Sequence, residues 1–174
     1  MKTTAFILFL VCSNLVGSGQ KGNNFDEEKE KSAILAALTA ETEFFFKRDY
    51  EGWKKCYIHT DYAFQAWSNA DGTFDAKVGW PEVDEKIGNY IRNNPVAPGS
   101  ASHPKVERRN MVWKFFTPEV VFMIWDQYNS DGGMKIYNHS KETRIMEKQG
   151  GSWKVVSVAS FWDYKNLIPV DSLK

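Results

Sequence analysis

The chain has 174 residues, in which 22 Lys plus Arg balance 22 Asp plus Glu, and its 12 Phe, 7 Trp and 7 Tyr make it rich in aromatic side chains. A formal net charge of zero provides no basic field for a phosphate backbone, which argues against a nucleic-acid-binding protein, and two Cys cannot make a disulfide scaffold. The apolar content excludes wholesale disorder, so one compact globular domain with an aromatic interior is expected.

The first 20 residues have the pattern of a secretory signal peptide. Lys2 gives a basic start, an apolar run covers residues 5–16, and small residues follow at 17–19. The run is shorter than the roughly 20 apolar residues that span a bilayer, and the alternative is a buried N-terminal helix. We therefore expect a signal peptide at residues 1–20, a single domain at residues 21–174, and a secreted or periplasmic protein with no membrane association after cleavage.

Cleavage of this signal would remove Cys12 and leave Cys56 as the one thiol of the mature chain. Cys56 lies between aromatic residues in a helical pattern. We interpret it as a small buried apolar residue rather than as a nucleophile.

Three helices are expected in the first half of the chain. Asn24 and Glu27 form a capping-box pair before a helix that runs to Lys47, with apolar residues at spacings of three and four. Asp49 is the expected N-cap of a short second helix. A third helix begins near Gly79, with a proline in its first turn, where a missing N–H does no harm.

Strands dominate the remainder of the chain. One early strand is expected at residues 61–68, and turn residues follow it. After a proline-rich loop, four consecutive antiparallel strands are expected at 105–116, 120–128, 134–148 and 153–162. This order of elements predicts an α+β fold in one domain.

Short motifs at both ends of this pattern resemble a known superfamily. They are Asp49-x-x-Gly52-Trp53-x-x-x-Tyr57, Gln127-Tyr128, Glu142-Thr143-Arg144 and Gly151-Ser152-Trp153. Together with the helix–helix–strand opening, they resemble the NTF2-like superfamily, which includes SnoaL-like polyketide cyclases, ketosteroid isomerase and scytalone dehydratase. The last three motifs also resemble the association domain of calcium/calmodulin-dependent kinase, and the resemblance covers residues 26–164. Such a resemblance indicates the fold but does not specify a function.

The resemblance implies an NTF2-like cone, in which a strongly bent antiparallel sheet wraps around a long N-terminal helix with two shorter helices. It places alternate residues of the last strands on the concave face: Phe122, Ile124, Asp126, Tyr128, Glu142, Arg144, Met146, Val156, Val158, Ser160 and Trp162. An apolar wall with a few polar groups is typical of a small-molecule pocket. The residues predicted to bind a ligand are Arg144, Glu142, Asp126, Tyr128, Trp162, Ser160 and Tyr57.

Glu142 and Arg144 are the most informative pair. Two residues apart on a strand, they share one face at about 7 Å along the strand. Arg144 could anchor an acidic ligand group while Glu142 or Asp126 orients it or acts as a base. The alternative is a structural ion pair that fills the cone, since a buried arginine needs a partner with or without a ligand.

The sequence assigns no catalytic residue, metal or cofactor. In the resemblance, the general base of ketosteroid isomerase falls on Ala66 and its oxyanion-stabilising Tyr falls near Glu41, so that mechanism lacks its parts. Glu41 could still face the pocket and serve another chemistry, but we interpret it as a solvent-facing acid. The three His residues are scattered over separate segments without metal-ligand spacing.

The opposite face of the sheet is also expected to be apolar. The resemblance and the strand periodicity place on it Val121, Met123, Trp125, Ile145, Val155, Ala159 and Phe161. Because a single antiparallel sheet normally leaves one face polar, an apolar outer face needs a cover. We expect a second copy of the chain to provide it, although the N-terminal leader or the C-terminal tail of the same chain is an alternative.

The sequence thus favours a secreted NTF2-like homodimer that binds a small, partly apolar and possibly acidic molecule in its cone. A cyclase, isomerase or dehydratase with a pocket carboxylate as base is the second hypothesis. A non-catalytic oligomerisation module is the third.

Overall fold

The computed structural model describes residues 25–96 and 104–173, so the predicted signal peptide and Asn24 lie outside the described residues. The helical elements are α1 (Glu27–Lys47), α2 (Tyr50–Lys55), α3 (Trp80–Val83), the π-helical turn η1 (Asp84–Gly88), α4 (Asn89–Asn93) and the 3₁₀ turn η2 (Val170–Ser172). The strands are β1 (Phe64–Ser68), β2 (Phe74–Val78), β3 (Val106–Thr117), β4 (Val120–Ser130), β5 (Ile136–Gln149) and β6 (Ser152–Pro169).

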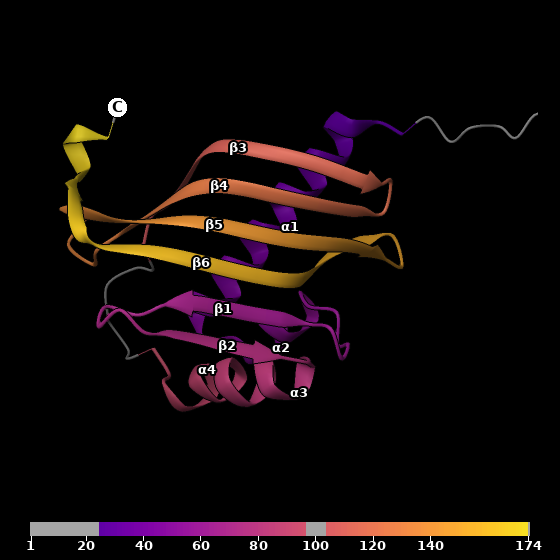
Figure 1. Cartoon of the computed structure of the whole chain (residues 1–174), viewed down its shortest axis with the longest axis horizontal. Helices are drawn as coiled ribbons and strands as arrows, with labels where there is room; N and C mark the ends of the chain where they lie inside the picture. Colours follow the sequence, from indigo (N-terminus) through magenta and orange to yellow (C-terminus); the bar gives the residue numbers. More distant parts are fainter. Residues whose placement is uncertain (1–24, 97–103, 174) are drawn as a thin grey trace, which may run out of the picture.

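The strands form one six-stranded sheet in the order β2-β1-β6-β5-β4-β3. Four of the five strand pairings are antiparallel, and three of these join the four long strands as expected, but β1 joins β6 in parallel, so the sheet is mixed. Figure 1 shows the sheet in front of α1, which crosses behind the strands. The α+β cone around a long N-terminal helix, predicted from the sequence, is confirmed.

Local hydrogen bonds explain where the first two helices begin. Asp26 caps α1 by accepting a hydrogen bond from the backbone N of Lys29 at 3.1 Å, so Glu27 is the first residue of the helix. The predicted capping box required Glu27 to be the third residue. Asp49 caps α2 through the backbone N of Gly52 at 2.9 Å, as predicted.

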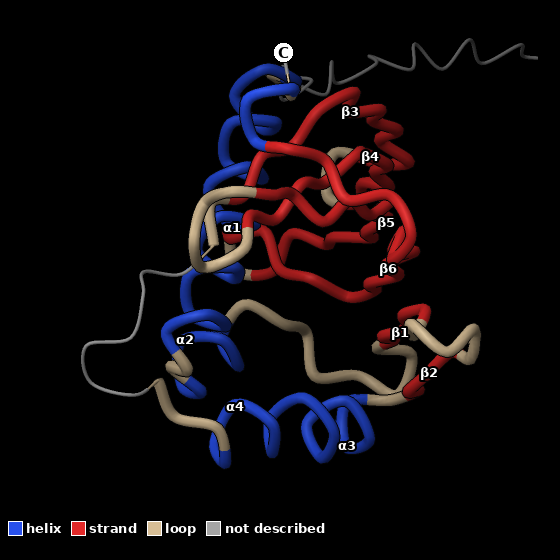
Figure 2. Tube along the Cα trace, turned by 90° about the vertical axis from the view of Figure 1, so that its left-hand side faces the viewer, coloured by secondary structure: helices blue, strands red, loops and turns tan. Residues whose placement is uncertain are grey.

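The segment after β1 differs from the prediction of a single early strand. Residues 69–72 do turn, but the chain returns as β2, which pairs with β1 from Phe64↔Val78 to Ser68↔Phe74. β2 alternates exposed and half-buried side chains and lies at the sheet edge, which explains its weak hydrophobic pattern. The helical segment that follows begins at Trp80 as predicted, and Figure 2 shows α2, α3 and α4 beneath the end of α1.

The register of β4 corrects the faces predicted for that strand. Met123 pairs with Arg144, and Trp125 with Glu142. Directly paired residues share a face, so Val121, Met123 and Trp125 point inward with the β5 pair and are fully buried in the core. The even-numbered residues of β4 consequently lie on the outer face. A one-residue error in aligning the strand reverses every side chain.

A bulge in β6 corrects a second assignment. Ile145 pairs with Ser157 and Met146 with Val155, so Val156 is an extra residue between them. Beyond this bulge the alternation predicted for β6 is preserved, with Val158 inward and Phe161 outward. Before the bulge it is shifted, and Val155 is therefore buried in the core and not on the outer face.

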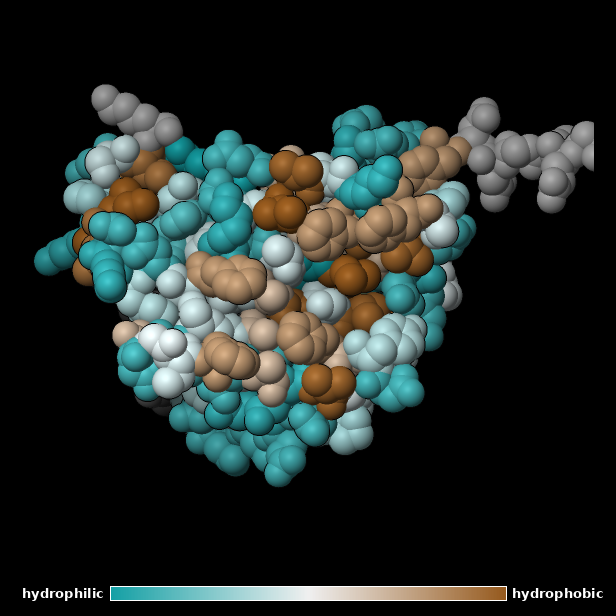
Figure 3. All heavy atoms as spheres, in the orientation of Figure 1, coloured by the Kyte–Doolittle hydropathy of each residue, from teal (hydrophilic) through white to brown (hydrophobic). Residues whose placement is uncertain are grey.

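The outer face of the sheet is apolar, although with different residues from those predicted on β4. Two rows cross the four long strands, and their members are Val112, Ile124, Thr143, Ala159, Lys114, Phe122, Ile145 and Ser157. Val112 and Phe161 each expose about 60 % of their surface (61 % and 59 %). Figure 3 shows apolar side chains gathered over this face.

Charged side chains lie at the end of this face where β3 begins. Glu107 accepts hydrogen bonds from Lys105 Nζ at 2.7 Å, Arg109 Nη2 at 2.9 Å and Tyr137 Oη at 2.8 Å. These donors stabilise the carboxylate and hold the pKa of Glu107 at about 2.

Candidate functional site

The cone contains a cavity of about 380 Å³ between α1, the short helices and the inner face of the sheet. Seven aromatic side chains line it: Phe45, Phe46, Trp53, Tyr57, Trp67, Tyr90 and Trp162. Polar and charged side chains that reach it are Glu41, Thr42, Gln65, Lys86, Gln127, Asn129, Glu142, Arg144 and Ser160. A hollow of this size and lining is typical of a small-molecule site.

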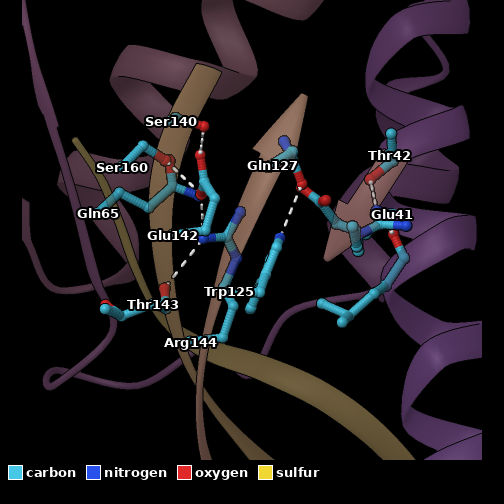
Figure 4. A network of polar contacts seen from close by, with 12 residues as sticks. Glu41, Thr42, Gln65, Trp125, Gln127, Ser140, Glu142, Thr143, Arg144 and Ser160 are labelled. Atoms are coloured by element: carbon cyan, nitrogen blue, oxygen red, sulfur yellow. Dashed lines mark hydrogen bonds and ion pairs between the residues drawn. The ribbon is translucent and has the colours of Figure 1, made fainter. Parts of the chain in front are cut away.

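On one side of the cavity, Glu142 lies at the centre of a buried polar network. Its carboxylate accepts hydrogen bonds from Ser140 Oγ at 2.6 Å, Ser160 Oγ at 2.7 Å and Arg144 Nη1 at 2.7 Å. The strand register explains the network, because Ser160 is the direct cross-strand partner of Glu142, and Ser140 and Arg144 lie two residues before and after it on β5. Figure 4 shows these side chains converging on Glu142.

Arg144 is held tightly in this network. It exposes 8 % of its surface, donates a further hydrogen bond to the carbonyl of Thr143 at 3.0 Å, and lies over the ring of Trp125, with Cζ 5.1 Å from the centroid. Burial opposes its charge, but the nearby carboxylates of Glu142 and Glu41 outweigh burial and raise the pKa of Arg144. The guanidinium is therefore a permanent cation that Glu142 neutralises.

Across the cavity, Glu41 projects from α1. Tyr57 Oη donates a hydrogen bond to Glu41 Oε1 at 2.8 Å and accepts one from Gln65 Nε2 at 2.8 Å. Burial, followed by the charge of Glu41, raises the pKa of Tyr57 well above its usual value, so this phenol stays a donor to the carboxylate. Tyr57, two residues after the end of α2, and Gln65 on β1 thus fix the position of Glu41 on α1.

Gln127 adds an amide to the polar lining from β4, and Arg108 on β3 lies beside it. Gln127 Oε1 accepts a hydrogen bond from Trp125 Nε1 at 3.2 Å, which fixes the orientation of the amide. Its cross-strand partner Arg108 donates from Nη2 to Thr42 Oγ1 at 2.8 Å. In Figure 4, Trp125 and Gln127 lie between the β5 network and Glu41 on α1.

Five of the predicted ligand-binding residues line this cavity, namely Arg144, Glu142, Trp162, Ser160 and Tyr57. Asp126 and Tyr128 do not, because they are even-numbered residues of β4 and lie on the outer face. Asp126 accepts hydrogen bonds there from Asn110 Nδ2 at 2.9 Å and pairs with Lys141 and His139. Burial works against its charge, but these partners outweigh burial and lower the pKa of Asp126. Asp126 therefore cannot act as a base inside the cone.

The sequence did not identify Glu41, Gln65, Gln127 and Asn129 as cavity residues, and it assigned Glu41 to solvent. A signal for Glu41 was present, since it follows the buried Ile34 and Leu38 by seven and three residues and so shares their helical face. No signal of this kind exists for Gln127, because its face depends on the register of β4.

Searches for relatives by sequence found no matching family model and no matching curated protein. Solved structures do match. An NTF-2-like protein of unknown function from Shewanella oneidensis MR-1 is 17 % identical, with 76 % of this chain and 98 % of that chain covered and a TM-score of 0.54. Another from Silicibacter pomeroyi DSS-3 is 10 % identical, covering 79 % and 99 %, with a TM-score of 0.57.

An enzyme is also among the structural neighbours. The hexachlorocyclohexane dehydrochlorinase LinA-type3 from Novosphingobium barchaimii LL02 is 16 % identical, with 82 % of this chain and 90 % of that chain covered and a TM-score of 0.55. These likenesses and the cone described above define the class: the chain has an NTF2-like fold. At such low identity the neighbours show the fold alone.

Two chemical properties of the site follow from its geometry. Its aromatic wall can bury an apolar ring or chain, and its polar lining can hold one polar group.

No helix among the described residues is long and apolar enough to cross a membrane.

Proposed function

We propose that this chain binds a small, partly apolar molecule in the cone. The observation that carries the proposal is the cavity of about 380 Å³, in which seven aromatic side chains surround a small set of ordered polar groups. A cavity of this size counts against the hypothesis of a purely structural oligomerisation module, whose cone would be filled by side chains.

The polar contact of the ligand was assigned from the sequence to Arg144, with an acidic group on the ligand. The ion pair of Arg144 with Glu142 counts against an acid, because it already neutralises the guanidinium. Arg144 remains a candidate polar contact through Nη2, which donates no hydrogen bond to any residue in the described part of the chain.

The proposal includes a homodimer formed through the outer face of the sheet. Exposed apolar side chains on β3 and β6 support it, because Val112, Phe116 and Phe161 each expose more than half of their surface to solvent in a single chain. A second copy presents the same side chains and covers them symmetrically. Secretion, proposed from the pattern of residues 1–20, would deliver this dimer to the outside of the cell or to a periplasm.

Two measurements test these parts. Native mass spectrometry of the protein purified from its own source should show a dimer that retains a small molecule, and a monomer at micromolar concentration would refute the dimer. Titration with naphthalene, followed by tryptophan fluorescence, should show one site per chain. Ile87→Trp, which fills the cavity, should abolish this binding, whereas the matched control Val78→Trp on the exposed surface of β2 should not. Equal binding by both variants would refute a ligand site in the cone.

An enzyme is the second candidate function, and Glu41 favours it. Glu41 is a carboxylate in an aromatic cavity, and one of its oxygens is not engaged by Tyr57. A base for proton abstraction has these features. Glu142 is less suited to that role, because its oxygens are occupied by two serines and Arg144.

A further inference from the structure

The charges around the polar part of the cavity restrict which chemical group a ligand can place there. Glu142 exposes 1 % of its surface and accepts hydrogen bonds at both oxygens. It already accepts three of the about four hydrogen bonds that a carboxylate can take, and it serves as the counter-ion of Arg144. This pair therefore presents to the cavity a neutral unit and not a free charge.

Glu41 differs from Glu142 in having an open oxygen. Within the described residues its one hydrogen bond comes from Tyr57 to Oε1, which leaves Oε2 as an acceptor on the cavity wall. The orientation of Glu41 is fixed, because Gln65 in turn holds the hydroxyl of Tyr57. A ligand group that donates a hydrogen bond satisfies this oxygen, and it gains the strength of a bond to a charged acceptor.

A donor is available on the neighbouring strand. Since Gln127 accepts from Trp125 through Oε1, its Nε2 is on the other side of the amide and donates to no residue in the described part of the chain. Gln127 and Glu41 both line the cavity, and Figure 4 shows Gln127 on β4 and Glu41 on α1 facing the same interior space. Together, Glu41 and Gln127 offer a ligand one charged acceptor and one neutral donor.

Charged ligand groups fit this arrangement poorly. A carboxylate placed there would meet the carboxylates of Glu41 and Glu142, and the cation of Arg144 is already paired. The other cation of the lining, Lys86, lies over the ring of Trp67 and pairs with Asp75 of β2 at 4.0 Å, away from Glu142. An ammonium that pairs with Glu41 would compete with Arg108 and Arg144, because both guanidinium groups are close enough to Glu41 for its charge to act on their pKa values. A hydroxyl carries no charge and can donate and accept at once, so it complements both Glu41 and Gln127.

The remaining wall indicates the rest of the ligand. A cavity of about 150 Å³ holds one benzene molecule, so about 380 Å³ leaves room for roughly two rings. Aromatic side chains surround that volume, and they pack well against flat rings by offset or edge-to-face contacts.

We propose that the cone recognises an uncharged, hydroxylated ring compound of about two rings, whose hydroxyl donates to Glu41 and accepts from Gln127. This inference rests on the proposed ligand-binding function and names its ligand class. It assigns to Glu41, rather than to Arg144, the main polar contact.

The test uses five related probes on the full chain at pH 7: naphthalene, 2-naphthol, 2-methoxynaphthalene, 2-naphthoate and the protonated form of 2-(aminomethyl)naphthalene. Isothermal titration should show that 2-naphthol binds at least tenfold more tightly than naphthalene, the range expected of a hydrogen bond to a charged acceptor. The methyl ether can accept but not donate, and it should lose most of this advantage. The carboxylate and the ammonium should bind more weakly than 2-naphthol.

Glu41→Gln should reduce the preference for 2-naphthol over naphthalene to less than about threefold, because a neutral acceptor replaces the carboxylate. Glu43→Gln is the matched control, since it makes the same change on α1 at a solvent-exposed carboxylate that pairs with Lys47, and it should keep the preference.

The outcomes separate the two proposals. If naphthalene and 2-naphthol both fail to bind, the ligand-binding function itself is wrong. If the two bind equally, if 2-naphthoate or the ammonium binds most tightly, or if Glu41→Gln keeps the full preference for 2-naphthol, the cone binds ligands but the hydroxyl assignment is overturned.

Discussion

Replacing Arg144 by methionine should destabilise the protein strongly, although no ligand is involved. Glu142 would then remain as an unpaired charge with 1 % of its surface exposed, supported only by the hydroxyls of Ser140 and Ser160. Breaking a buried ion pair by removing one partner costs about 3–5 kcal/mol. We expect the free energy of unfolding of Arg144→Met to fall by that amount, as measured by urea denaturation at pH 7 with tryptophan fluorescence.

The double variant Glu142→Gln with Arg144→Met tests whether the loss of stability comes from the unpaired charge of Glu142. Removing both charges of a buried pair is often close to neutral, so the double variant should recover most of the lost stability. The exposed pair of Glu43 and Lys47 provides a matched control, and Lys47→Met should be indistinguishable from the wild-type chain. If Arg144→Met costs less than about 1 kcal/mol, or if the double variant is as unstable as the single one, Glu142 is not the buried counter-ion described above.

Other predictions test the faces and the titrating groups. Met123→Ala should lower the free energy of unfolding by about 2–5 kcal/mol, because it opens a cavity in the core. Ile124→Ala on the outer face should lower it far less in a single chain. Equal losses of stability would contradict the register of β4. Burial raises the pKa of Cys56 to about 11, so in a Cys12→Ser background its reaction with a thiol reagent at pH 8 should be slow and should accelerate in urea. The pKa of Glu107 is lowered to about 2, so its contribution to stability is complete above its unfolded pKa and is lost as the pH falls towards 2. Glu107→Gln should therefore lower stability at pH 7 by about 1–2 kcal/mol after allowance for solvent screening and leave it unchanged near pH 2, and a loss of equal size at both pH values would refute the linkage.

The order and type of most elements could be predicted from the sequence because their signals are local. The cap at Asp49, the proline after Trp80 and the turns between the long strands each act within a few residues. The edge strand β2 could not be predicted, because its side chains alternate between exposed and half-buried and so show little hydrophobic contrast.

The candidate site was less predictable because it depends on register. On β5 the polar residues Glu142 and Arg144 alternate with more exposed neighbours, so the inner face is evident once the strand is known. On β4 apolar residues occupy both faces, since Phe122 and Ile124 are outside and Val121 and Met123 are inside. Hydrophobic alternation therefore cannot select a face there, and only the pairing with β5 can do so.

Glu41 and Glu142 show why residue type alone could not assign the roles in the cone. Both are glutamates that reach the same cavity, and the sequence favoured Glu142 because it lies beside Arg144 on one strand. That proximity is what makes Glu142 a structural residue, since the cation two residues away pairs with the carboxylate and two serines bind the same group. Within the described residues Glu41 forms no ion pair on its own helix and accepts a hydrogen bond from Tyr57 alone, so its second oxygen stays available. In a closed polar network, the group free to bind a ligand is the one with an unused hydrogen-bonding atom.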